Sequence, residues 1–156
     1  MDNKLTAISL FTGAGGMDIG FEGGFKCLKQ SINKDLHPNW IENENSNWVT
    51  VSKTGFETVF ANDIRLDAKA AWVSYFSSIY KNANEIYHVE SIVDLVKKAQ
   101  MGEKIFPDNI DIVTGGFPCQ DFSVAGKRKG FNSDKSHTGG KLEIDNPTVE
   151  SRGQLY

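Results

Sequence analysis

The chain has 156 residues, 39% hydrophobic and 24% charged, and a formal net charge of −3, which are ordinary values for one globular domain. It has no apolar run of about 18 residues and no pattern of a secretory signal, so neither a membrane span nor export is expected. Two cysteines, Cys27 and Cys119, do not make a disulfide framework, and we expect a cytoplasmic location. The negative charge argues against strong nucleic-acid binding by this chain alone, because phosphate neutralisation dominates such binding.

Strand and helix patterns alternate along the chain. Residues 5–11 are a buried-strand pattern, followed at once by glycines and a short helix pattern. Residues 66–80 carry apolar residues at helical spacing, and Ser91 is a suitable N-cap for a helix over 91–101. Further strands are predicted at 57–61, at 110–114 and, more weakly, at 86–89. This order predicts an α/β fold with a Rossmann-like parallel sheet.

Two polar segments interrupt this alternation. Residues 33–55 form an insertion with two tryptophans, Trp40 and Trp48, for which packing on the core is the default interpretation. Residues 126–151 are polar and glycine-rich and predict a long mobile loop, a feature that is usually functional or disordered.

Glycines and carboxylates follow the predicted strands at their carboxyl ends. FTGAGG, 11–16, comes directly after the first strand, Asp63 after the second, and Glu90 after the weak third. Ligands of open α/β sheets bind at this edge, and the glycine turn with Asp63 fits an adenosyl ligand. The glycines alone are equally compatible with a tight strand-to-helix turn that binds nothing, and Asp63 or Glu90 alone with a solvated or capping residue.

Cys119 follows the strand at 110–114 and is expected at the same edge. Pro118 stiffens the backbone before it, and its surroundings are polar and glycine-rich. These surroundings favour a reactive thiol over a buried, inert one, whereas the inert interpretation suits Cys27.

Five blocks in this order resemble the cytosine-5 DNA methyltransferase family. They are FTGAGGMDIGF at 11–21, AND at 61–63, GGFPCQDFS at 115–123, GKRKGF at 126–131 and SRGQLY at 151–156. The resemblance leaves out only the insertion 33–55 and the stretch 132–150. It implies the amino-terminal part of an S-adenosylmethionine-dependent methyltransferase fold, with residues 120–150 as a mobile catalytic loop.

The resemblance also implies residue roles. Cys119 would attack C6 of a cytosine turned out of the duplex, which makes C5 nucleophilic enough to take the methyl group. Residues that match the cofactor-binding segments are Phe11, Gly13, Gly15, Gly16, Asp63, Ile64, Glu90, Ser91, Gly116, Pro118 and Leu155. Residues expected to contact DNA are Gln120, Ser123, Lys127, Arg128 and Lys129, for whose basic run a solvated surface is the alternative.

Some family features differ or do not occur. Ser9 stands where the family often has an acidic residue. The Glu-Asn-Val segment, the target-recognition domain and the last cofactor segment do not occur, so we expect little or no methyl transfer by this chain alone. Three origins are therefore expected as alternatives: an expressed piece of a longer enzyme, one half of a split enzyme, or the product of a truncated gene. Double-stranded DNA is the expected partner once the remaining part is supplied, and the incomplete sheet invites a second chain or self-association.

Other functions stay open from the sequence. The leading interpretation is a DNA methyltransferase of a restriction–modification system, and a catalytically silent binding or assembly module is the alternative. A nicotinamide-dependent oxidoreductase is disfavoured by the missing GxGxxG pattern, and an RNA substrate stays possible. No metal site is expected because His37, His88 and His137 are far apart, and His137 is expected to be solvated in the loop.

Overall fold

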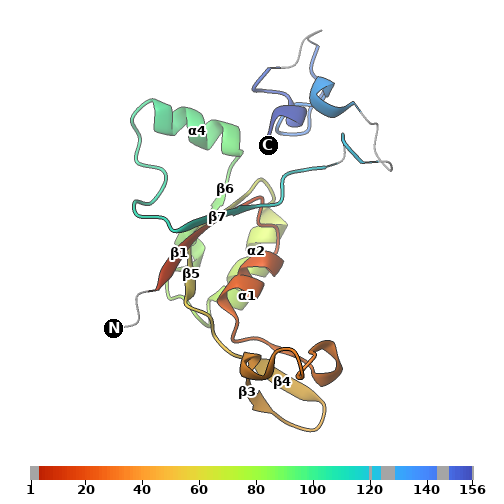
Figure 1. Cartoon of the computed structure of the whole chain (residues 1–156). Coiled ribbons are helices and arrows are strands. Elements are labelled where there is room, and N and C mark those ends of the chain that lie inside the picture. Colours follow the sequence, from red (N-terminus) through yellow and green to blue (C-terminus); the bar gives the residue numbers. More distant parts are fainter. Residues whose placement is uncertain (1–3, 120, 124–128, 144–147, 156) are drawn as a thin grey trace.

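A parallel four-stranded sheet forms the centre of the protein, with the strand order β6-β5-β1-β7 (Figure 1). The structure is a computed structural model that describes residues 4–119, 121–123, 129–143 and 148–155. The four strands are β1 (Leu5–Leu10), β5 (Phe56–Asp63), β6 (Tyr87–Val89) and β7 (Ile112–Gly115). The predicted α/β fold with a parallel sheet is therefore confirmed, including the weak strand before Glu90.

Helices cover both faces of this sheet. Helices α1 and α2 lie on one side and α4 on the other (Figure 1). Successive residues of a strand point to opposite faces, so Ala61 packs with Trp72 of α2 while its neighbour Phe60 packs with Leu95 of α4. The helices are α1 (Gly16–Glu22), α2 (Leu66–Phe76), α3 (Ala83–Ile86) and α4 (Ile92–Gln100).

The helix predicted over 66–80 ends earlier, at Phe76. The Ser77 and Ser78 hydroxyls donate hydrogen bonds to the carbonyls of Val73 and Tyr75, and such back-bonding competes with helix propagation. The predicted N-cap of α4 is confirmed, because Ser91 Oγ accepts the backbone N–H of Val93.

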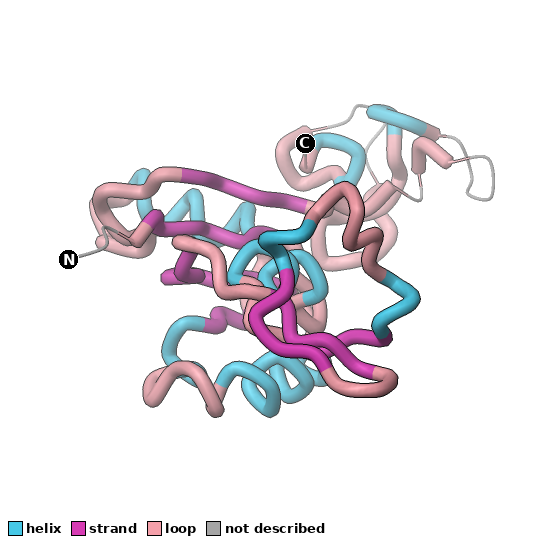
Figure 2. Tube along the Cα trace, turned by 60° about the horizontal axis from the view of Figure 1, so that its bottom comes forward, coloured by secondary structure: helices cyan, strands magenta, loops and turns pink. Residues whose placement is uncertain are grey.

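Two strands of the insertion pair with β2, which precedes it, in a second sheet of order β2-β4-β3 that shares no strand with the first (Figure 2). Neither Trp40 nor Trp48 lies in the core. Both are about half exposed, and Trp40 stacks on His37. β2 (Lys26–Leu28) and the 3-10 turn η1 (Lys29–Ser31) precede the insertion. The insertion contributes the 3-10 turn η2 (Pro38–Trp40), β3 (Ile41–Glu44) and β4 (Trp48–Val51).

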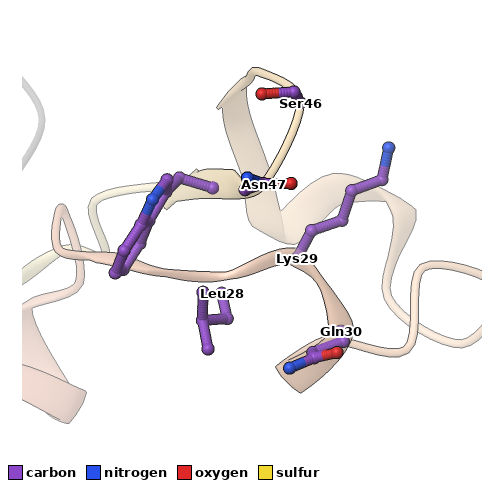
Figure 3. Close-up of a pocket in the computed structure, with 6 residues that line it drawn as sticks. Leu28, Lys29, Gln30, Ser46 and Asn47 are labelled. Atoms are coloured by element: carbon purple, nitrogen blue, oxygen red, sulfur yellow. The ribbon is translucent and has the colours of Figure 1, made fainter.

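A surface hollow of about 560 Å³ lies on this small sheet (Figure 3). Residues 28–30 and 46–48 line it, and none of the residues predicted for catalysis or cofactor binding is among them. None of the helices within the described ranges is long and apolar enough to cross a membrane.

The carboxyl-terminal segment is irregular but hydrogen-bonded. Its described residues include η3 (Gly130–Asn132) and η4 (Arg152–Gln154), and isolated bridges join Lys135 to Lys141 and Ser136 to Ser151.

Candidate functional site

The carboxyl ends of the parallel strands open into a pocket of about 340 Å³. Each of the four strands delivers a segment to this edge, as expected for an open α/β sheet. The predicted residues that line the pocket are Phe11, Asp63, Ile64, Ser91, Gly116, Pro118 and Leu155. The other lining residues are Asn62, Arg65, Ile92, His137, Gly139 and Arg152. The remaining predicted cofactor residues, Gly13, Gly15, Gly16 and Glu90, are not in the lining.

The glycine turn is fixed to the neighbouring strands by hydrogen bonds. The Gly13 N–H donates to Asp63 Oδ2 at 3.0 Å, and the Tyr87 hydroxyl donates to the Gly13 carbonyl at 2.9 Å. Burial raises the pKa of the Tyr87 hydroxyl, which therefore keeps its proton as a donor. Phe11 has φ of 54°, which is unusual for a residue with a side chain and is typically found at ligand sites. The turn is thus held in one shape before any ligand arrives.

Asp63 is oriented rather than free. Its Oδ1 accepts the Arg65 N–H at 3.1 Å, while Oδ2 holds Gly13. Each carboxylate oxygen accepts more than one hydrogen bond, so acceptor capacity is left on the pocket side. That capacity suits a pair of vicinal hydroxyls.

Glu90 and Ser91 differ in what they present to the pocket. The Glu90 side chain forms an ion pair with Lys98 of α4, and its carbonyl accepts Asn62 Nδ2 at 2.8 Å. Ser91 lines the pocket and is itself buried.

Cys119 is exposed next to the pocket. It follows Pro118, a lining residue, at the end of the segment that leaves β7. The Cys119 carbonyl accepts the N–H groups of Phe122 and Ser123, both at 2.9 Å, so the chain turns sharply after the thiol. The thiol of Cys119 is therefore accessible from solvent and directly follows a residue of the pocket wall.

A comparison with protein families identifies the chain. The family model described as C-5 cytosine-specific DNA methylase matches residues 5–142. The chain belongs to this family.

Curated relatives support the assignment to C-5 cytosine-specific DNA methylases. Type II methyltransferase M.BspRI of Lysinibacillus sphaericus is 33% identical over 81% of this chain and 26% of its own length. M.Bsp6I of a Bacillus strain is 32% identical over 85% of this chain and 28% of its own length. The chain thus spans about a quarter of the length of these relatives. No solved structure matches significantly.

Asp18 is a buried carboxylate next to the glycine turn that the sequence interpretation of this methylase chain missed. Its carboxylate is 2% exposed and accepts hydrogen bonds from Ser9 Oγ, from Thr12 Oγ1 at 2.6 Å and from Trp72 Nε1 at 2.6 Å. It joins β1, the glycine turn and α2 at one point. Ser9, which departs from the family pattern, here serves as a donor to Asp18. The available signal was a carboxylate within the otherwise apolar helix pattern of MDIGF, 17–21.

A second buried carboxylate, also missed, is that of Asp121, which pairs with the half-buried Arg152. The Asp121 carboxylate is 3% exposed and accepts Arg152 Nε at 2.9 Å, Arg152 Nη2 at 3.1 Å and Ser133 Oγ at 2.8 Å. The Arg152 guanidinium lowers the pKa of Asp121 below its usual value. Because Arg152 also lines the pocket, this pair connects the pocket wall to the segment beside the thiol.

The residues expected at DNA lie in different settings. Ser123 is half-buried, and Lys129 is exposed and forms an ion pair with Asp134. Gln120, Lys127 and Arg128 lie outside the described residues.

The expectation that His137 is solvated is wrong. Its side chain is buried, lines the pocket and is hydrogen-bonded through both ring nitrogens. The segment 148–155 folds back beside α4 and supplies the partner Glu150, a contact that a reading of local composition cannot anticipate.

The glycines of the turn are predicted to differ in their tolerance of a side chain. A Cβ on Gly15, where φ is +86°, would lie 2.5 Å from Trp72 Cδ1, whereas at Gly13, with φ of +56°, nothing lies within 4 Å. Gly15→Ala should lower the free energy of unfolding by about 2–3 kcal/mol, because strain and overpacking add. Gly13→Ala should cost about 1 kcal/mol, for the left-handed backbone alone. Urea unfolding followed by circular dichroism measures both, and equal losses would contradict the packing role of Gly15.

Proposed function

We propose that this chain forms the S-adenosylmethionine-binding and nucleophile portion of a DNA (cytosine-5-)-methyltransferase of a restriction–modification system. One observation carries the proposal: an exposed Cys119 directly follows the wall of a pocket lined by segments from all four strand ends. The family membership makes the methyl donor the natural occupant.

The described residues fit such a cofactor. The pocket volume lies within the range of about 300–1,000 Å³ that is common for small-molecule sites. Its lining combines apolar side chains, such as Ile64 and Leu155, with the oriented carboxylate of Asp63. In this proposal Asp63 accepts the ribose hydroxyls, Ile64 packs on the adenine, and the fixed glycine turn leaves room for the backbone to approach the ligand.

In the proposed reaction the Cys119 thiolate, its proton lost to solvent, forms a bond to C6 of the target cytosine. The electron pair of the C5–C6 double bond moves into the ring and makes C5 nucleophilic. Bound S-adenosylmethionine would supply an electrophilic methyl group on a sulfonium. C5 takes this methyl group as the methyl–sulfur bond breaks, and the electron pair of that bond stays on sulfur as a neutral thioether. Loss of the C5 proton to solvent then restores the C5–C6 double bond and breaks the bond to Cys119, which leaves as thiolate. Pro118 and the hydrogen bonds to the Cys119 carbonyl keep the thiol at the rim of the pocket.

The cofactor half of the proposal is tested by titrating the chain with S-adenosylmethionine and, separately, with NADH in a calorimeter. Only the former is expected to bind. Asp63→Ala should weaken binding by about 10- to 100-fold, because charge-assisted hydrogen bonds are worth about 1.5–3 kcal/mol. Asp63→Asn, which keeps an acceptor for the Gly13 N–H, should be less affected.

Asp108→Asn is the matched control, since Asp108 is an exposed carboxylate that pairs with Lys104 and does not line the pocket. Preferential binding of NADH, or an affinity unchanged by Asp63→Ala, would overturn this assignment.

A further inference from the structure

His137 belongs to the one part of the carboxyl-terminal segment that matches none of the five family blocks. It nevertheless reaches the pocket, where it lies beside Ser91 and is only 8% exposed. The family model extends to residue 142 and so includes His137, but none of the five blocks that carry the resemblance assigns a role to this buried ring of the pocket lining.

Two side chains hold the imidazole of His137, and a third side chain holds one of these two. Ser91 Oγ lies 2.6 Å from His137 Nδ1, and Glu150 Oε2 lies 2.8 Å from His137 Nε2. Glu150 in turn forms an ion pair with Lys97 of α4, and Lys97, followed by His137, lowers the pKa of Glu150. The backbone N–H of His137 donates to the Glu150 carbonyl at 2.7 Å, so ring and main chain are both held.

These contacts decide which atoms of the ring are left for a ligand. An ionised carboxylate can only accept hydrogen bonds, so His137 Nε2 carries a proton and donates a hydrogen bond to Glu150. Nδ1 is occupied by Ser91. Both nitrogens are therefore used inside the protein, and the ring offers its carbon edge and faces to the pocket. Such a surface suits a flat, apolar partner rather than a charged one.

We propose that His137 is a cofactor-binding residue whose ring packs against the adenine of S-adenosylmethionine on the Ser91 side of the pocket. This inference rests on the proposed function. Ser91 and Ile92 line the pocket next to His137, whereas Asp63 provides the carboxylate suited to the ribose. The stretch that carries His137 thereby adds a wall to the cofactor site that none of the five blocks supplies.

The order Ser91, His137, Glu150 also resembles that of a nucleophilic triad. Ser91 is unsuited to that role because it is buried and its Oγ accepts the Val93 N–H as the cap of α4. The array is therefore assigned to positioning the ring.

The test measures the affinity of the 156-residue chain for S-adenosylmethionine and S-adenosylhomocysteine by calorimetry. His137→Ala should weaken both by about tenfold, because an aromatic contact and its buried area are lost. His137→Phe keeps a planar ring and should retain more affinity than the alanine variant. His37→Ala is the matched control, because His37 stacks on Trp40 in the small sheet.

A measurement on the unaltered chain avoids any folding defect of the variants. In carbon–proton correlation spectra, the ring signals of His137 should shift on titration with S-adenosylhomocysteine, while those of His37 stay in place. If the ligand binds and the His137 signals and the affinity of His137→Ala are unchanged, this inference fails and the proposed function stands. If the unaltered chain binds neither ligand, the proposed function itself fails. Labelling of Ser91 by a fluorophosphonate would instead support the nucleophilic triad and overturn the assignment of His137 as an adenine-packing residue of the pocket wall.

Discussion

Replacing Cys119 with serine is expected to abolish covalent attachment to DNA that carries 5-fluorocytosine. The experiment uses a protein in which this chain is joined to the segments that its relatives carry beyond the matched region. Fluorine at C5 cannot leave as a cation, so the bond from Cys119 to C6 persists once the methyl group has been transferred. Methyl transfer to ordinary cytosine should fall by about a thousandfold or more, because the covalent route is lost. Gel shift under denaturing conditions and methyl incorporation measure the two effects.

Cys27→Ser is the control for this experiment. Cys27 is half-buried in β2 of the small sheet, away from the pocket lining, and its replacement should leave both readouts unchanged. Attachment that survives in Cys119→Ser, or that disappears in Cys27→Ser, would remove the proposed nucleophile.

Replacing Asp18 with alanine is expected to cause the largest loss of stability, about 4 kcal/mol of unfolding free energy. Three buried or part-buried donors, Ser9 Oγ, Thr12 Oγ1 and Trp72 Nε1, would lose their acceptor together. A buried donor left without a partner costs about 1–3 kcal/mol, and charge-assisted hydrogen bonds are the stronger ones. Denaturant unfolding monitored by circular dichroism provides the measurement.

Two milder variants separate the role of the Asp18 carboxylate from packing. Ser9→Ala removes one donor and leaves two, so it should cost about 1 kcal/mol. Asp18→Asn keeps one carbonyl oxygen but turns an amide donor toward the remaining donors. Its loss of unfolding free energy should lie between those of Ser9→Ala and Asp18→Ala. A loss in Asp18→Ala no greater than that in Ser9→Ala would show that the carboxylate does not organise the turn.

Features that depend on neighbouring residues were predictable. The apolar runs at 5–11 and 110–114 form β1 and β7, and Ser91 caps α4, because strand burial and capping are visible in local patterns. Asp63 and Cys119 could be placed at one edge because the carboxyl ends of parallel strands coincide.

Features that depend on distant residues were not predictable in the same way. Asp18 meets Trp72, Asp121 meets Arg152 and Ser91 meets His137 across 54, 31 and 46 residues of chain. Each partner looks like an ordinary polar or aromatic residue in its own segment. The insertion likewise gave no clear strand alternation, yet it pairs with β2 into a separate sheet.

The order of apolar runs, glycine turns and the proline-cysteine pair was enough to indicate the parallel sheet, the family resemblance and the edge at which the pocket opens, since these depend on backbone propensity and burial of short segments. Folding then determined which polar groups are buried together. The packing of whole elements determines which hydrogen-bond partners a buried carboxylate or imidazole meets. For this reason Asp18 of α1 holds the glycine turn against α2, and His137 forms part of the pocket wall.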